Sequence, residues 1–266
     1  MSSVLRAESL LKIYGRRRVV DGVDIEVRAG EIIGLLGRNG AGKTTTFMMM
    51  VGLVKPDAGA IHLDGRDISG TPTYLRARLG LTYLPQEGSV FLKASVRDNL
   101  RLGLELSSYA KSEQAAIASG LLEEMGLADL AGQSAHSLSG GERRRLEICR
   151  ALILNPKFLL LDEPFTGIDP LTILELQKIM RGLRAKGIGM ILSDHNVRDT
   201  FRIADRAYII DEGRILVEGP PDMVAADKTA LASFLGQDFR WDPGRDAGYS
   251  SDSANRRSPN VSPRKK

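Results

Sequence analysis

Three short, largely apolar segments are the first pattern along this chain. They cover residues 31–36, 158–161 and 188–192, and glycine or polar residues border them. Runs of this length that are apolar at successive positions predict strands buried on both faces. Such strands are typical of a parallel sheet with helices packed on either side, so the pattern predicts an α/β fold.

Two further patterns predict antiparallel strand pairs beside that sheet. Near the N-terminus, residues 10–14 and 19–27 flank a turn at Gly15, and apolar side chains alternate along the second segment. Towards the C-terminus, residues 208–210 and 215–217 flank an Asp-Glu-Gly-Arg turn and predict a hairpin.

The first buried strand leads into a glycine-rich segment. Residues 37–44 match G-x-x-x-x-G-K-[ST] and precede a predicted helix. Glycines let main-chain N–H groups surround a phosphate, and the helix N-terminus adds the positive end of its dipole. Lys43 would supply charge to the β- and γ-phosphates, and the Thr44 hydroxyl would bind Mg²⁺. The candidate nucleotide-binding residues here are Gly37, Asn39, Gly40, Ala41, Gly42, Lys43, Thr44 and Thr45.

Two carboxylates end the second buried strand. Asp162 and Glu163 follow the apolar residues 158–161 directly. Ligands of parallel sheets bind at the carboxyl ends of the strands, where these side chains are expected to lie. Carboxylates often end strands without any catalytic role, but the phosphate loop favours a functional interpretation. Asp162 is then expected to contact Mg²⁺, directly or through water, and Glu163 to polarise the attacking water.

A third motif indicates the family. Residues 138–142, Leu-Ser-Gly-Gly-Glu, together with the phosphate loop resemble the signature of ATP-binding-cassette (ABC) ATPases. Further family motifs follow: Gln86 after Tyr-Leu-Pro, Gly-Ile-Asp at 167–169, and His195 after a predicted strand. The resemblance spans about residues 4–239. It implies ATP hydrolysis with ATP and Mg²⁺ as cofactors. It also implies a P-loop NTPase fold with a RecA-like parallel core, an N-terminal antiparallel β subdomain and a helical subdomain.

The resemblance also implies a domain organisation. Residues 1–239 form the nucleotide-binding domain, and a helical subdomain at about 89–156 agrees with the largely helical pattern of 95–155. Residues 240–266 are polar and serine-rich and are predicted to be a disordered basic tail. The tail has seven Lys and Arg against three Asp, and so carries the whole formal net charge of +4. The charge therefore indicates no nucleic-acid partner for the domain.

The signature segment implies a homodimer. In the resembled family, main-chain N–H groups at Ser139, Gly140 and Gly141 bind the γ-phosphate held by a second subunit, and Asp169 lies at the same interface. Each residue also has a purely structural interpretation. Ser139 and Glu142 have the spacing of a capping box, and Asp169 before a proline is a typical N-cap. Both interpretations remain open at this point.

The other family motifs imply further contacts with the nucleotide. His195 matches the γ-phosphate sensor and is expected to start a helix. Gln86 is expected to contact Mg²⁺ and the attacking water and to link the site to the helical subdomain. Tyr14, near the first hairpin turn, matches an aromatic residue that stacks on adenine. A tyrosine at the edge of a strand, without any contact to nucleotide, is the alternative for Tyr14.

Several segments resemble, more narrowly, the ATPase of lipopolysaccharide-export systems: 83–87, 138–145, 194–198 and 234–239. This resemblance implies integral membrane permease subunits as partners, with contact near Phe91, which would otherwise be a core residue. It implies a cytoplasmic protein, peripheral on the cytoplasmic face of the inner membrane. Lipopolysaccharide would be moved by the complex and not bound by this chain.

Two alternatives are the ATPase of a branched-chain amino-acid importer and a soluble ABC protein acting on ribosomes or nucleic acid. The second normally requires tandem cassettes or a long coiled-coil insertion, and the sequence has neither pattern. Composition adds two exclusions. A single cysteine, Cys149, rules out an internal disulfide framework, and no apolar run reaches the ~18–20 residues of a membrane span.

Overall fold

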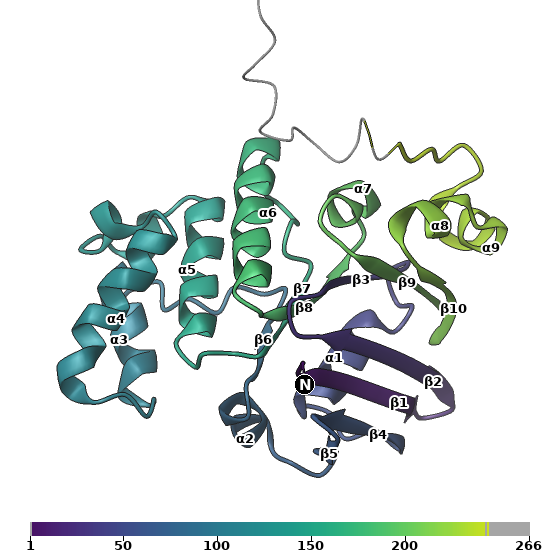
Figure 1. Ribbon diagram of the computed structural model, residues 1–266, viewed down its shortest axis with the longest axis horizontal. Coiled ribbons are helices and arrows are strands. Elements are labelled where there is room, and N and C mark those ends of the chain that lie inside the picture. The colour runs from purple at the N-terminus through teal and green to yellow at the C-terminus, as the bar shows by residue number, and fades with distance from the viewer. Residues whose placement is uncertain (1, 243, 245–266) are drawn as a thin grey trace, which may run out of the picture.

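A computed structural model describes residues 2–242 and 244 and has a mainly parallel sheet at its centre (Figure 1). The strand order is β10-β9-β3-β8-β7-β6, in which only β10 runs antiparallel to its neighbour. The strands are β3 (Ile32–Leu36), β6 (Leu81–Leu84), β7 (Phe158–Asp162), β8 (Gly189–Asp194), β9 (Arg206–Asp211) and β10 (Arg214–Gly219). The three predicted buried strands and the C-terminal hairpin are confirmed.

A second, antiparallel sheet has the order β2-β1-β4-β5. Its strands are β1 (Val4–Tyr14), β2 (Arg17–Arg28), β4 (Ala58–Leu63) and β5 (Arg66–Asp67), so the N-terminal antiparallel pair is confirmed. Helix α1 (Lys43–Val51) packs between the two sheets, where Phe47 and Met50 share a hydrophobic core with Leu5 and Leu160. The helix that follows the phosphate loop is therefore held on both sides.

Helices dominate the chain between β6 and β7, as predicted. Helices α3 (Val96–Glu105), α4 (Lys111–Glu124) and α5 (Gly140–Leu152) lie together at one side of the molecule (Figure 1). The remaining α-helices of the described chain are α2 (Thr73–Arg78), α6 (Pro170–Ala185), α7 (Val197–Phe201), α8 (Pro221–Ala226) and α9 (Lys228–Ala230). There are also two 3-10 helical turns (Ala128–Leu130 and Ala135–Ser137) and a π-helical turn (Leu231–Leu235). Within the described chain, no helix is long and apolar enough to cross a membrane.

Successive side chains of the central strands enter different cores, because a strand alternates its faces. On β7, Phe158 and Leu160 join the core around α1, whereas Leu159 and Leu161 join the core that includes residues of α3–α6. Both faces of the sheet are therefore covered, and the carboxyl ends of its strands are left to carry polar groups.

The packed part of the chain extends past the predicted domain boundary at residue 239. Trp241, assigned above to the disordered tail, packs edge-to-face on Phe201 of α7 at a ring-centroid distance of 5.3 Å. Phe239 contacts the same ring at 6.3 Å. The tail prediction is therefore wrong for Trp241, because the ring of Phe201 supplies a packing surface for its indole. The rest of the predicted tail, 243 and 245–266, lies outside the described residues.

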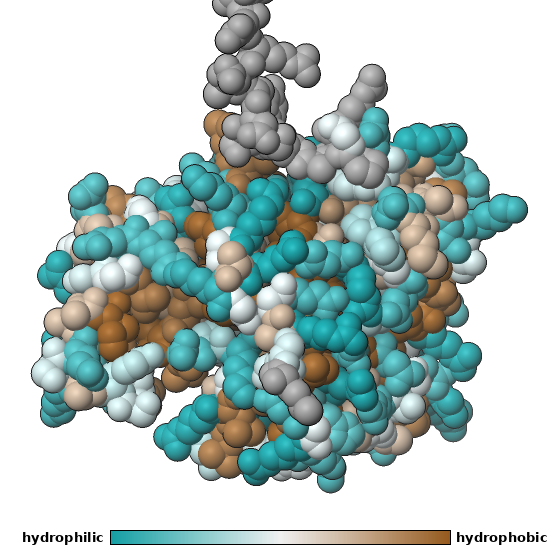
Figure 2. Space-filling model, viewed as in Figure 1, coloured by the Kyte–Doolittle hydropathy of each residue, from teal (hydrophilic) through white to brown (hydrophobic). Residues whose placement is uncertain are grey.

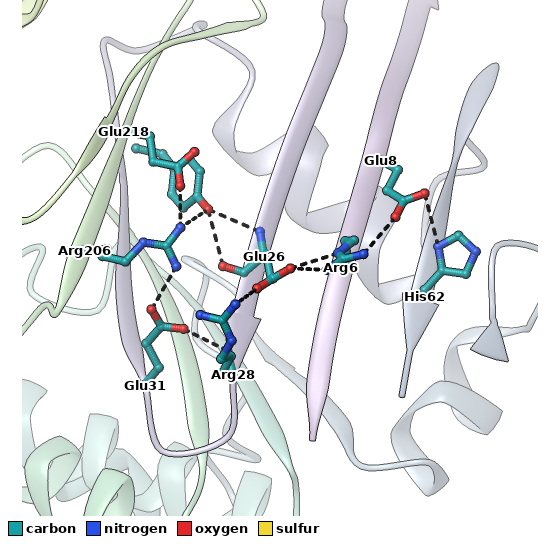
Figure 3. Close-up of polar contacts among 9 residues, drawn as sticks. Arg6, Glu8, Glu26, Arg28, Glu31, His62, Arg206 and Glu218 are labelled. Carbon is teal, nitrogen blue, oxygen red and sulfur yellow. Dashed lines mark hydrogen bonds and ion pairs between the residues drawn. The ribbon is translucent and has the colours of Figure 1, made fainter. Parts of the chain in front are cut away.

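A ladder of charged side chains joins the two sheets (Figure 3). Arg206 on β9 pairs with Glu31 at 2.9 Å and with Glu218 on β10 at 2.5 Å. On the antiparallel sheet, Arg6 of β1 donates from Nε to Glu26 of β2 at 2.9 Å. The members of this ladder are Arg6, Glu8, Glu26, Arg28, Glu31, His62, Arg206, Tyr208 and Glu218.

This ladder gives a prediction for acid stability. The hydrogen bond from Arg6 holds the pKa of the Glu26 carboxyl below its usual 4.5. A lowered folded-state pKa contributes stability above pH 4.5 that is lost as the pH falls through the lower, folded value. We expect Glu26→Gln to reduce the unfolding free energy at pH 7 and to flatten its decline in acid. Urea denaturation at pH 3 to 7 measures both effects, and parallel pH profiles for parent and variant would contradict the prediction.

Candidate active site

The phosphate loop lies between β3 and α1, in close contact with two other strands. A Cβ atom on Gly37 would lie 2.2 Å from the carbonyl oxygen of Ile210 on β9. Gly42 has φ +111°, and a Cβ there would lie 2.6 Å from the carbonyl oxygen of Val19 on β2. Gly40 also has a positive φ, +80°. Only glycine permits both the positive φ and the close approach to a neighbouring carbonyl oxygen that this loop requires.

The N-terminus of α1 fits an anion. No side chain caps it at Gly42, and its first turn contains no acidic residue. Its terminal N–H groups therefore have neither a capping side chain nor a repelling carboxylate, as a phosphate ligand requires. Lys43 is almost fully buried, and its Nζ donates to the carbonyls of Gly37 at 2.7 Å and Arg38 at 3.1 Å. Burial lowers the Lys43 pKa, opposed by the nearby acidic side chains.

Asp162 ends β7 with both of its carboxylate oxygens hydrogen-bonded. The Ser193 hydroxyl donates to Oδ1, and the Tyr83 hydroxyl donates to Oδ2 at 3.1 Å. Burial, followed by the nearby Asp162 charge, raises the pKa of Tyr83 well above its usual value, so the phenol keeps its proton to donate. Sequence reasoning missed both partners. They lie on the neighbouring strands β6 and β8, and their chain positions gave no signal of this contact.

The Glu163 carboxylate contacts a residue of its own loop and residues of two segments that are distant in the chain. Its Oε2 accepts from Gln86 Nε2 at 2.9 Å and from Thr166 Oγ1 at 3.0 Å, and it lies 3.6 Å from His195 Nδ1. Its backbone adopts φ +47°, a left-handed conformation that is uncommon for residues other than glycine.

Since α7 has Asn196 as its N-cap, the prediction that His195 starts the helix is off by one or two residues.

The phosphate loop and the Glu163 group face one cleft of about 580 Å³. Its lining residues are Val19, Gly37, Arg38, Asn39, Gly40, Gly42, Lys43, Thr44, Thr45, Gln86, Glu163, His195 and Phe234. Val19, Arg38 and Phe234 were not predicted as site residues, whereas the predicted Ala41 does not line the cleft. Tyr14 is absent from this lining; it is half-exposed, with the Lys12 ammonium 5.4 Å from its ring centroid. Its contact with adenine stays a prediction.

The residues at the cleft fit a magnesium nucleotide. No group of three or more His, Cys, Asp or Glu side chains that could hold a metal ion occurs in the described part of the chain. Mg²⁺ commonly takes one or two protein ligands and completes its shell with phosphate oxygens and water. The Thr44 hydroxyl and the Gln86 amide at the cleft suit that arrangement. The predicted ligand Asp162 is fully buried and does not line the cleft, so its contact with Mg²⁺ stays a prediction.

The signature residues lie away from this cleft. Ser139 and Glu142 form the predicted capping box at the start of α5: Ser139 N donates to Glu142 Oε2 at 2.8 Å, and Glu142 N to Ser139 Oγ at 3.3 Å. Asp169 caps α6, accepting from Leu171 N and Thr172 N at 3.1 Å each. Both structural interpretations are confirmed. Neither Ser139, Gly140, Gly141 nor Asp169 lines the cleft of the same chain.

A buried ion pair on α5, between Arg144 and Glu147, connects the end of β7 to the loop that follows β6. Arg144 Nη1 lies 2.8 Å from Glu147 Oε2, and both side chains are less than a tenth exposed. Arg144 also donates to the carbonyls of Asp162 at 3.1 Å and Pro85 at 3.3 Å, and Glu147 accepts from Ser89 N at 2.9 Å. Sequence reasoning missed this pair; opposite charges three residues apart within an otherwise apolar helix face were the available signal.

Phe91 lies at the surface of the helical region. Half of it is exposed, and the Arg150 guanidinium lies 4.7 Å from its ring centroid. Buried Asn99 accepts from Phe91 N at 2.8 Å and donates to its carbonyl at 3.0 Å, which holds the loop with the ring outside. The alternative of a core phenylalanine is wrong. Apolar side chains also reach the surface over α3 and α4 (Figure 2), including Leu102 and Leu106 on or beside α3.

Comparison with known proteins agrees with this geometry. The model of the ABC transporter family matches residues 20–166. The chain is 52% identical over 240 residues to the lipopolysaccharide export system ATP-binding protein LptB of Acidithiobacillus ferridurans, covering 90% of this chain and all of the relative. For the protein of the same name in Escherichia coli K12, identity is 48% over 90% of this chain and 99% of the relative.

Solved structures show the same fold. An ATP-binding cassette of an ABC transporter in its ADP conformation matches with a TM-score of 0.80 and 26% identity, over 89% of this chain and all of the other. A cassette subunit of the Clostridium perfringens complex cbiONQ matches with a TM-score of 0.79 and 27% identity, over 87% of this chain and 94% of the other. The predicted fold class is therefore confirmed.

Proposed function

Because this chain belongs to the ABC transporter family of ATPases, we propose that it is the ATP-hydrolysing subunit of a lipopolysaccharide export system. ATP and Mg²⁺ are its cofactors. The observation that carries the cargo assignment is the 52% identity to an LptB protein along that relative's whole length.

In this proposal the cleft residues divide the work of hydrolysis. Lys43 and the N–H groups of the phosphate loop bind the β- and γ-phosphates, and Thr44, Gln86 and Asp162 hold the metal. Bound Mg²⁺ supplies positive charge to the phosphate oxygens. Glu163 accepts the proton of the attacking water as a general base. Its hydrogen bond from Gln86 and its proximity to His195 support this role, because both neighbours orient the carboxylate towards the cleft.

Hydrolysis is proposed to take place in a homodimer. The N-termini of α5 and α6 are packed together: a Cβ on Gly141 would lie 2.2 Å from the Thr172 Cγ2 atom. The N–H groups at Ser139, Gly140 and Gly141, together with Asp169, would then complete the site of a second copy. The exposed side chains of Leu171 and Leu174 beside Asp169 support a contact surface at this place.

Force would reach the membrane partners through the surface around Phe91. The Arg144–Glu147 pair supports this route, because it binds both the main chain at Asp162 and the loop that carries Phe91. The partners are integral membrane permease subunits, which place this chain on the cytoplasmic face of the inner membrane. Lipopolysaccharide is bound and moved by the complex, and not by this chain.

Affinity capture of this chain from detergent-solubilised membranes tests the proposal. Co-purification of membrane subunits that carry lipopolysaccharide, detected by mass spectrometry, is the expected result. Co-purification of permeases that instead carry amino-acid binding proteins would favour an importer. Sedimentation with ribosomes that is sensitive to RNase would contradict membrane export altogether.

Phe91→Ala separates partner binding from folding. We expect partner affinity to fall about 30-fold, as for a central aromatic anchor of an interface. The ATPase rate of the isolated chain and its melting temperature should change little, because a half-exposed ring loses only a surface contact with Arg150. Met223→Ala, an exposed apolar side chain on α8, is the control for non-specific effects. A stability loss of ~3–5 kcal/mol would indicate a core role and contradict the prediction.

A further inference from the structure

Arg76 on α2 is the largest fully buried side chain in the described chain, with 1% of it exposed. Its acceptors are all main-chain carbonyls, and no ion pair is found for it within residues 2–242 and 244. Burial lowers the pKa of the guanidinium, opposed by the charge of Asp67. A charge buried without a carboxylate partner is costly, so its hydrogen bonds must fulfil a specific need.

Two of those hydrogen bonds are made at the C-terminal end of α1, the helix that follows the phosphate loop. Arg76 Nη1 donates to the carbonyls of Met49 at 2.9 Å and Met50 at 2.6 Å, both in the last turn of α1. The last carbonyls of a helix lack partners within the helix and lie at the negative end of its dipole. The Met49 carbonyl also accepts from Gly52 N at 3.1 Å, so Arg76 adds a second donor there, and it donates to the Met50 carbonyl as well. A guanidinium suits this place because it offers several donors and a permanent charge.

The other two bonds anchor the same guanidinium to the segment before α2. Nε donates to the carbonyl of Thr71, and Nη2 to that of Ser69, both at 2.8 Å. Gly52 lies against the same guanidinium: with φ +82°, a Cβ there would lie 2.8 Å from Nε and 3.1 Å from the Thr71 carbonyl oxygen. Arg76 therefore connects the end of α1 to the chain that leads through α2 and β6 to Gln86.

We propose that Arg76 is a positioning residue for ATP, which sets the location of α1 and thereby of the phosphate-binding N–H groups at its other end. Helix α1 has only nine residues and no side-chain cap at its N-terminus. Its two ends are about 12 Å apart, so a shift at the C-terminal end reaches the phosphate loop. A helix that must bind phosphate tightly at one end is thus fixed by a buried cation at the other.

The first test replaces the planar guanidinium of Arg76 by a lysine ammonium group, so that the positive charge is kept and the arrangement of donors is lost. For Arg76→Lys we expect the KM for ATP to rise about tenfold while kcat changes much less, because binding and not proton transfer is affected. The Kd of a fluorescent ATP analogue should rise by the same factor at temperatures well below melting. Arg78→Lys, an exposed arginine of the same helix, should leave both values unchanged. Unchanged values for Arg76→Lys in folded protein would overturn the proposal.

A second test keeps Arg76 and displaces it. Gly52→Ala places a methyl group against the guanidinium, and Gly65→Ala imposes a similar backbone strain at φ +78° with no atom within 4 Å. We expect only Gly52→Ala to weaken binding of the ATP analogue and to accelerate amide hydrogen exchange at residues 43–47. If Arg76→Lys does not fold, this pair decides: equal affinities for the two alanine variants would overturn the proposal, even if both lower the melting temperature.

Discussion

Glu163→Gln should reduce ATP hydrolysis by about 10²–10⁴-fold while ATP binding is retained, as expected on removal of a general base. Glutamine nearly preserves the shape and the hydrogen bond with Gln86, but it cannot accept the proton of the attacking water. Because ATP is then bound without turnover, a nucleotide-dependent dimer should accumulate. Phosphate release measures the rate, and light scattering after gel filtration with ATP measures the dimer.

The control for this substitution is Glu212→Gln in the turn between β9 and β10. Glu212 shares φ +47° with Glu163 but is exposed and does not line the cleft. It should hydrolyse ATP at the parental rate, which separates the lost proton acceptor from any effect of the strained backbone. Hydrolysis by Glu163→Gln at the parental rate would show that another group is the base.

Glu147→Ala is expected to cost about 3–5 kcal/mol of unfolding free energy, the largest stability effect predicted for this chain. The substitution leaves the Arg144 charge buried without its partner, and it removes the acceptor of Ser89 N. Chemical denaturation followed by circular dichroism measures the loss. The exposed Arg101–Glu105 pair provides the control, since Glu105→Ala should cost less than about 0.5 kcal/mol.

A double substitution separates the charge penalty from the connection. In Arg144→Met with Glu147→Leu no charge remains buried, so most of the lost stability should return. The contacts with the main chain at Asp162 and Pro85 are nevertheless absent, so stimulation of ATPase activity by membrane partners should stay low. Full recovery of that stimulation would show that the ion pair does not link the site to the partner surface.

Local patterns account for what was predictable. The strands around Leu35, Leu160 and Ile191 followed from runs of apolar residues, because only a sheet covered on both faces suits them. The phosphate loop was recognisable because its glycines, lysine and threonine are consecutive in the chain. The caps at Ser139 and Asp169 depend on side chains that reach main-chain atoms two or three residues away.

The remaining features depend on residues far apart in the chain. Trp241 lies among the polar residues of the predicted tail, and only the ring of Phe201, distant in the chain, gives it a packed position. Composition left Phe91 undecided between core and surface, because the answer depends on Asn99 and on what α5 already covers. The sequence pattern likewise gave no indication of which groups accept hydrogen bonds from Arg76.

By itself, the sequence determined the nucleotide chemistry and the strands with continuous or alternating apolar positions, since both are recognisable from residues that are near neighbours in the chain. Only the tertiary structure decided which hydroxyls orient Asp162, which neighbours aim Glu163, and that a buried arginine ends the helix of the phosphate loop. Those contacts form where β6, β7 and β8 end side by side and where α2 meets α1. Their partners are chosen by packing and not by order along the chain.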